Sequence, residues 1–221
     1  MPILYYYLSL SGRLITAFLT GLAAGYLLIK WAEKLMLQKA RLKTLLLLSN
    51  TENDRIKAAI LMAAGSVCLL VRRSADWHLL FSWLFFCILF LSGYIDQMIW
   101  VIPNEGIVTA LFLWGFRCVC MGESFPQIIL KFLLSVIFAA LLILIVAILE
   151  RGKKRTMLGR GDIKLLFVTA LCLGMERTLY VLALSCLCGL MLFALSGKKD
   201  KRRQIPFGPC IAFSGFLVLL V

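Results

Sequence analysis

The chain has 221 residues, of which 62% are hydrophobic and only 16% charged, and it carries 24 Lys plus Arg against 11 Asp plus Glu. This composition excludes an ordinary soluble domain, in which about a quarter of the residues are charged. The net charge of +13 does not indicate a nucleic-acid partner, because the basic residues are divided among several loops and no nucleic-acid-binding motif accompanies them. We therefore predict an all-α, polytopic transmembrane helix bundle that forms a single integral membrane domain over residues 1–221 and contacts lipid.

Eight apolar stretches divide the chain into expected membrane spans. A crossing needs about 20 mostly apolar residues, and a helix satisfies its own backbone hydrogen bonds in lipid. In chain order, the expected spans cover residues 8–29, 56–72, 77–95, 105–121, 126–149, 163–176, 178–196 and 207–221. The sixth and the eighth are short, so their flanks are buried in the bundle or the count differs by one. Within the first span, Gly21 and Gly25 form a small-xxx-small face that we expect to pack against another helix.

The distribution of basic residues predicts the orientation in the membrane. Cytoplasmic loops carry an excess of Lys and Arg, and 18 of the 24 basic residues follow the first, fifth and seventh spans, at residues 30–57, 150–164 and 197–203. We therefore expect these loops, including a short basic loop over 30–55, to face the cytoplasm and both termini to lie outside. The expected location is the inner or plasma membrane.

Two acidic residues lie at the ends of apolar stretches. Asp96 ends the third span and Asp162 begins the sixth, with a two-span hairpin between them. An even number of crossings returns the chain to the same side, so both carboxyl groups are expected at the cytoplasmic boundary. Two nearby carboxyl groups can share a proton and activate a water as an aspartic protease does. The alternative for Asp162 is a cap of the helix that begins at Ile163.

Short motifs surround both acids. Asp162 ends a GxGD element, Gly159-Arg160-Gly161-Asp162, whose glycines remove side chains beside the carboxyl group and allow backbone angles that other residues avoid. Asp96 is followed after five residues by Ile102-Pro103-Asn104, and the last span is entered through Pro206-Phe207-Gly208-Pro209. In this order, D-x5-IPN, GxGDxK and PFGP resemble the type IV prepilin leader peptidase family, which includes preflagellin peptidases, over residues 80–221.

The resemblance implies a function. Asp96 and Asp162 would be the catalytic pair, Gly159 and Gly161 would shape the site, and the enzyme would cut the basic leader from type IV prepilin or pseudopilin precursors at the cytoplasmic membrane face. Such processing serves pilus assembly and protein secretion, and the resemblance implies no cofactor. The sequence does not predict the oligomeric state.

Accessory residues admit two interpretations each. Pro103 and Asn104 either hold Asp96 in place or form a plain interhelical turn, and Pro206, Gly208 and Pro209 either line the substrate cleft or end the basic loop. Lys164 lies two positions after Asp162 and therefore on another helix face. The preferred interpretation of Lys164 is a basic residue that sets the membrane topology. The alternative is an anchor for lipid phosphate or substrate.

The chain also departs from the family pattern. Many bacterial members bind zinc through two CxxC pairs after the first span and also methylate the new pilin N-terminus, whereas residues 30–55 here contain no cysteine and no CxxC occurs anywhere. The eight cysteines are interpreted as small packing residues: Cys68, Cys87, Cys118, Cys120, Cys172, Cys186, Cys188 and Cys210. The sequence therefore argues against a metal site and against N-methyltransferase activity. Family members often have basic residues where this chain has the largely apolar residues 97–101, so a different substrate preference is expected.

A second hypothesis uses the same two acids differently. In a transporter or membrane scaffold, Asp96 and Asp162 would relay protons or bind cations. Transporters place such residues near the bilayer midplane, often in interrupted helices, whereas both acids here are predicted at one edge. This position favours the peptidase.

Overall fold

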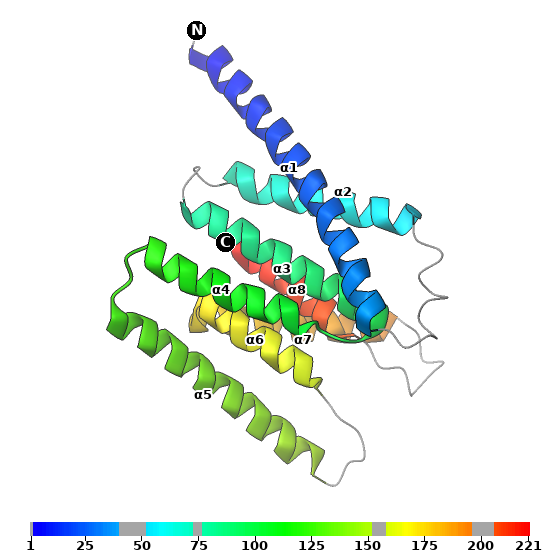
Figure 1. Ribbon diagram of the computed structural model, residues 1–221, viewed down its shortest axis with the longest axis vertical. Helices are drawn as coiled ribbons and strands as arrows, with labels where there is room; N and C mark the ends of the chain where they lie inside the picture. The colour runs from blue at the N-terminus through cyan, green and yellow to red at the C-terminus, as the bar shows by residue number, and fades with distance from the viewer. Residues whose placement is uncertain (1, 40–51, 73–76, 152–157, 196–205) are drawn as a thin grey trace. The chain divides into compact units, whose positions relative to one another are not determined.

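The computed structural model describes residues 2–39, 52–72, 77–151, 158–195 and 206–221. Over these residues the chain forms eight α-helices and no strand, so the all-α prediction is confirmed (Figure 1). The helices are α1 (Pro2–Lys39), α2 (Glu52–Arg72), α3 (Trp77–Ile99), α4 (Asn104–Cys120), α5 (Phe125–Glu150), α6 (Arg160–Leu173), α7 (Met175–Leu195) and α8 (Gly208–Leu220).

Each expected span corresponds to one of these helices. Four stretches are long and apolar enough to cross a membrane among the described residues, namely Gly12–Leu37, Trp77–Ile99, Phe125–Glu150 and Met175–Leu195. The chain is therefore a multi-pass membrane protein. Helix α1 continues well past residue 29 because Ala32, Leu35 and Met36 extend its buried face at helical spacing. The middle of the expected basic loop, residues 40–51, and most of the basic residues of the other two loops lie outside the described residues.

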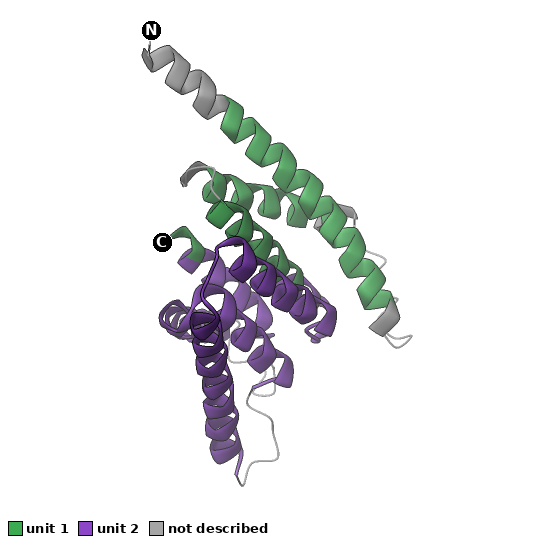
Figure 2. Ribbon diagram, turned by 60° about the vertical axis from the view of Figure 1, so that its left-hand side comes forward, with its two compact units in different colours: residues 1–91, 219–221 green, residues 92–218 purple. Residues whose placement is uncertain are grey.

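The chain divides into two compact units, residues 1–91 with 219–221 and residues 92–218 (Figure 2). In the first unit, α1 packs along α2. A Cβ atom built on Gly21 would lie 2.8 Å from the Cα atom of Ala63, and one built on Gly25 would lie 3.1 Å from the Cα atom of Ala59. The expected small-residue packing face is thus confirmed, and its partner is α2.

In the second unit, α6 lies against α4, α5 and α7. Helix α6 has only 14 residues, and it buries eight of them, including Leu165, Leu166 and Leu171. A helix enclosed by other helices is held by protein contacts on several sides. The short length of this expected span is therefore explained by its burial inside the second unit.

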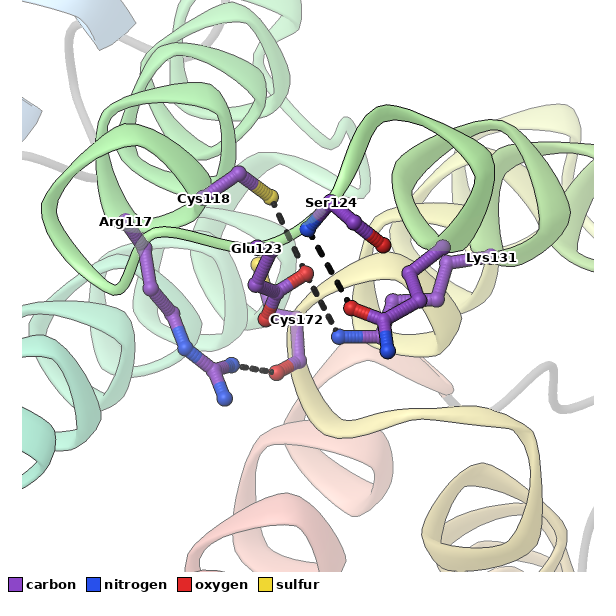
Figure 3. Close-up of polar contacts among 7 residues, drawn as sticks. Arg117, Cys118, Glu123, Ser124, Lys131 and Cys172 are labelled. Atoms are coloured by element: carbon purple, nitrogen blue, oxygen red, sulfur yellow. Dashed lines mark hydrogen bonds and ion pairs between the residues drawn. The ribbon is translucent and has the colours of Figure 1, made fainter.

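A polar cluster joins the ends of three helices in this unit (Figure 3). Lys131 on α5 donates to Glu123 in the α4–α5 turn at 2.6 Å. Arg117 on α4 donates from Nη1 to the carbonyl oxygen of Cys172 near the end of α6, at 2.5 Å. A cation at a helix C-terminus satisfies carbonyls that lack a helical partner. The cluster therefore holds α4, α5 and α6 together at the end of α6 opposite to Asp162.

Candidate active site

Asp96 lies in the last turn of α3 and is 7% exposed. A buried carboxylate is costly unless hydrogen bonds replace the lost water. Its Oδ2 atom accepts a hydrogen bond of 2.9 Å from the backbone amide of Gly208, the first residue of α8. The structure therefore brings the PFGP element, 112 residues further along the chain, directly onto the acid that precedes the IPN element.

Asp162 lies in the first turn of α6 and is 8% exposed. Its Oδ2 atom accepts a hydrogen bond of 3.1 Å from the amide of Gly159, the N-cap residue. This contact between an acid at the third helical position and the N-cap amide is half of a capping box. Asp162 therefore stabilises the start of its own helix as a first-turn acid, although this helix begins at Arg160 and not at Ile163 as the alternative interpretation expects. The contact uses only one of its two carboxyl oxygens.

The two carboxyl groups interact electrostatically. The pKa of Asp162 is raised from 3.8 to about 6, chiefly by burial and secondly by the charge of Asp96. The hydrogen bond from the Gly159 amide opposes this shift. A charge on one acid disfavours a charge on the other only when the two groups are near each other. Asp96 and Asp162 therefore form a coupled pair, in which Asp162 holds its proton more readily than it would alone.

The glycines of the GxGD element provide space rather than unusual backbone angles. Gly159 has φ −67° and ψ 141°, which any residue can adopt. A Cβ atom at this position, however, would lie 2.8 Å from Oδ2 of Asp162. A Cβ atom on Gly161 would lie 3.0 Å from the Cβ atom of Ile102. Gly159 thus makes room for the carboxyl group, and Gly161 lets the buried Ile102 of the IPN element pack against α6.

The chain between Asp96 and α4 turns sharply. Trp100 donates its amide to the carbonyl oxygen of Asp96 at 2.9 Å and has φ +59°. This left-handed conformation is uncommon for a residue with a side chain and costs about 1 kcal/mol. Pro103 is the N-cap of α4 with φ −70° and ψ 131°. Together these residues end α3 within one turn after Asp96 and start α4 directly after Pro103.

The side chains of Lys164 and Asn104 are in contact in the second unit, near the N-terminal ends of α6 and α4. The Nζ atom of Lys164 donates to Oδ1 of Asn104 at 3.0 Å, and both side chains are exposed. The contact joins the IPN element to the GxGDxK element across 60 residues. Sequence reasoning assigned Lys164 to membrane topology and missed this partner, since two residues far apart in the chain carry no sign of their contact.

Gly93 and Cys210 were also missed as neighbours of the site. Gly93 lies three residues before Asp96, and a Cβ atom there would be 2.8 Å from the Cβ atom of Ala212 on α8. Cys210, in the first turn of α8, lies within electrostatic range of Asp96 and Asp162. The one available signal was the helical spacing of Gly93 and Asp96, which places both on one face of α3.

The other residues of the PFGP element pack against two helices. The ring of Phe207 would lie 3.6 Å from a Cβ atom built on Gly189 of α7. The Cα atom of Pro209 would lie 3.3 Å from one built on Gly93. Pro206 precedes α8 and is half-buried. The element therefore lies against α3 and α7 rather than forming a free loop end.

The described residues contain no group of three or more His, Cys, Asp or Glu that could hold a metal ion. All eight cysteines fall within described helices as free thiols. Among the described residues, the hydrogen bonds at the candidate site thus join two carboxyl groups to two glycine amides and join Lys164 to Asn104.

Comparison with known proteins gives one match. The sequence model of the type IV leader peptidase family matches residues 83–194, which include Asp96, the IPN element and the GxGD element. No curated protein and no solved structure matches the chain. The family match covers half of the chain and agrees with the resemblance inferred from its motifs. The chain therefore belongs to the type IV leader peptidase family.

Proposed function

We propose that this membrane peptidase is an aspartic endopeptidase that removes the basic leader from type IV prepilin-like or pseudopilin precursors. The single observation that carries the proposal is the coupled pair of buried acids, Asp96 and Asp162, each with one oxygen bound to a glycine amide. Both acids are within the family match, and both lie at helix ends of the same unit.

The proposed mechanism needs one shared proton. One carboxyl group is ionised and takes a proton from a water, while the other is neutral and donates a hydrogen bond to the carbonyl oxygen of the scissile peptide as the water attacks. Both carboxyl groups now carry a proton. As the C–N bond breaks, the group that was neutral from the start gives its proton to the leaving amine, and the proton taken from water stays on the other group and restores the singly protonated pair. The raised pKa of Asp162 fits the neutral role for this residue.

The proposed side of cleavage is the cytoplasmic face of the inner or plasma membrane. Arg160 and Lys164 flank Asp162, in a chain whose basic residues concentrate in the loops predicted to be cytoplasmic. The proposed substrate presents a short basic leader followed by an apolar helix, so that its cleavage site lies at the membrane boundary. We further propose that the chain cleaves without methylating its product, because the segment between α1 and α2 has no cysteine for a zinc site.

The transporter or scaffold alternative has less support. Asp96 lies three residues before the end of α3, and Asp162 is the third residue of α6. A proton or cation pathway would place its acids within the spans rather than at their ends. No contact among the described residues favours that alternative over the peptidase.

Co-expression with a prepilin reporter tests the proposal. Asp96→Asn and Asp162→Asn each replace a carboxyl group with an amide of the same shape, so we expect both variants to insert into the membrane and to leave the precursor uncleaved. Glu176→Gln is the matched control, because Glu176 is an exposed acid in the first turn of α7. We expect this control to cleave like the wild type. Full processing by either Asp variant would refute the proposed pair.

A further inference from the structure

The contact between Gly208 and Asp96 leaves no room for a side chain. A Cβ atom at position 208 would lie 2.6 Å from Oδ2, 2.8 Å from Cβ and 2.9 Å from Cγ of Asp96. Atoms at such distances overlap, and Asp96 is buried in the last turn of α3, where its own backbone is held by the helix. A glycine is therefore needed at position 208 for the carboxyl group to keep its place.

The same face of α3 approaches α8 one turn earlier. A Cβ atom on Gly93 would lie 2.8 Å from the Cβ atom of Ala212 and 3.3 Å from the Cα atom of Pro209. Two glycines on facing helices thus allow the close approach that carries the Gly208 amide to within 2.9 Å of Asp96 Oδ2. The hydrogen bond depends on tertiary packing and not on local chain geometry.

Asp162 is held by a local version of the same contact. The Gly159 amide donates to Asp162 Oδ2 at 3.1 Å, and a Cβ atom on Gly159 would lie 2.8 Å from that oxygen. In both cases an amide donor restricts rotation of the carboxyl group and favours its ionised form. In both cases Oδ1 is the carboxyl oxygen without a donor among the described residues.

We propose that Gly208 is the positioning residue of Asp96, and that its amide fixes Oδ2 so that Oδ1 faces the water and the second acid. This inference rests on the proposed function for its catalytic consequence. Helix α8 then completes the active site, although it lies beyond the family match at residues 83–194. Among the described residues, the titratable groups that interact with Asp96 are Asp162 from α6 and Cys210 from α8.

The catalytic consequence of the contact between Gly208 and Asp96 is tested by cleavage kinetics, with purified protein in lipid nanodiscs and a prepilin peptide as substrate. In Gly208→Ala, the added methyl group displaces the carboxyl group from the amide. A displacement of about 1 Å at a reacting group can cost about 100-fold in rate, so we expect kcat to fall by about 100-fold with KM within about threefold of the wild type. The acid limb of the kcat profile should also move to higher pH, because ionised Asp96 loses its donor.

Two glycine variants serve as controls. Gly93→Ala disturbs the same α3–α8 contact without touching the carboxyl group, and Gly115→Ala adds a methyl group where no atom lies within 4 Å. We expect Gly93→Ala to leave the acid limb in place and Gly115→Ala to match the wild type. Equal losses in Gly208→Ala and Gly93→Ala with no shift of the acid limb would mean that position 208 only supports packing, and the inference would fail.

Amide spectroscopy tests the hydrogen bond without any substrate. In protein labelled with ¹⁵N-glycine, the Gly208 signal is assigned by its absence in Gly208→Ala. We expect Asp96→Asn to move the Gly208 amide proton upfield and leave Gly159 unchanged, and Asp162→Asn to do the reverse. If the Gly208 amide signal is the same in Asp96→Asn as in the wild type, the inference is overturned. Failure of the wild type to cleave prepilin would instead refute the proposed function, and the spectroscopic result would still decide the positioning contact.

Discussion

At Asp162, burial beside a second acid makes folding depend on pH. The folded protein holds the proton of Asp162 with a pKa of about 6, against 3.8 as the ordinary value. A raised carboxyl pKa means that stability is greatest below the ordinary value and declines as the pH rises through about 6, because the ionised form is disfavoured in the folded state. The proposed catalytic role would thus fall to an acid that the folded chain holds more easily in its neutral form.

This linkage gives a prediction for Asp162→Asn. The amide stays neutral at every pH, so we expect the variant to lose cleavage and yet to be more stable than the wild type at pH 7, by on the order of 1–3 kcal/mol. The gain should vanish near pH 4. Unfolding in mixed micelles at both pH values measures it. The exposed Glu176→Gln should show no such gain, and a stability difference for Asp162→Asn that does not change with pH would contradict the pKa shift.

At the scale of the helix, close packing of α1 on α2 depends on missing side chains. A Cβ atom on Gly21 would lie 2.8 Å from both the Cα atom of Ala63 and the side chain of Ser66. Gly12 lies on the same helix, and a Cβ atom built there would have no atom within 4 Å. The two glycines thus offer a matched comparison of the same substitution with and without a neighbouring helix.

We expect Gly21→Leu to destabilise the protein by about 1–3 kcal/mol, because overpacking forces the helices apart. Gly12→Leu should stay within about 0.5 kcal/mol of the wild type. Reversible unfolding in detergent, followed by helix content, compares the two variants. Equal stability of both variants would show that α1 and α2 do not pack at Gly21 in the membrane.

At the scale of the whole molecule, the orientation in the bilayer decides where cleavage takes place. Helix α5 carries one charged residue, Lys131, between its N-terminus and Glu150, and it is one of the four helices fit to cross a membrane. Its two ends should therefore lie on opposite sides of the membrane. Cys120 precedes the N-terminal end and Arg151 follows the C-terminal end, and both are exposed.

Thiol labelling of intact cells checks this orientation. In a variant that keeps only Cys120 among its cysteines, we expect a membrane-impermeant maleimide to label the protein from outside. With Arg151→Cys as the single cysteine, labelling should require permeabilised cells, because the basic segment is predicted to be cytoplasmic. The opposite pattern would place Asp96 and Asp162 outside and would contradict cleavage at the cytoplasmic face.

Much of the fold was predictable because its signals are local. Apolar runs of membrane length determine a helix wherever the chain has no water to satisfy its backbone, and all eight expected spans have a corresponding helix. The pairing of Gly21 and Gly25 with a neighbouring helix was predicted from their spacing, although α2 as the partner was not. The length of α1 was underestimated, because its buried face continues among charged residues beyond the apolar stretch.

For the candidate site, sequence reasoning identified the acids and their flanking motifs but not the contacts between them. By itself, the sequence determined a helical membrane protein with two isolated acids at helix ends, because hydropathy and charge act residue by residue along the chain. Only the tertiary structure decided that Gly208 binds Asp96, that Lys164 binds Asn104, and that Asp96 raises the pKa of Asp162. The physical reason is that hydrogen bonds and charge coupling act over a few ångströms, and only packing brings residues 60 or 112 positions apart within that range.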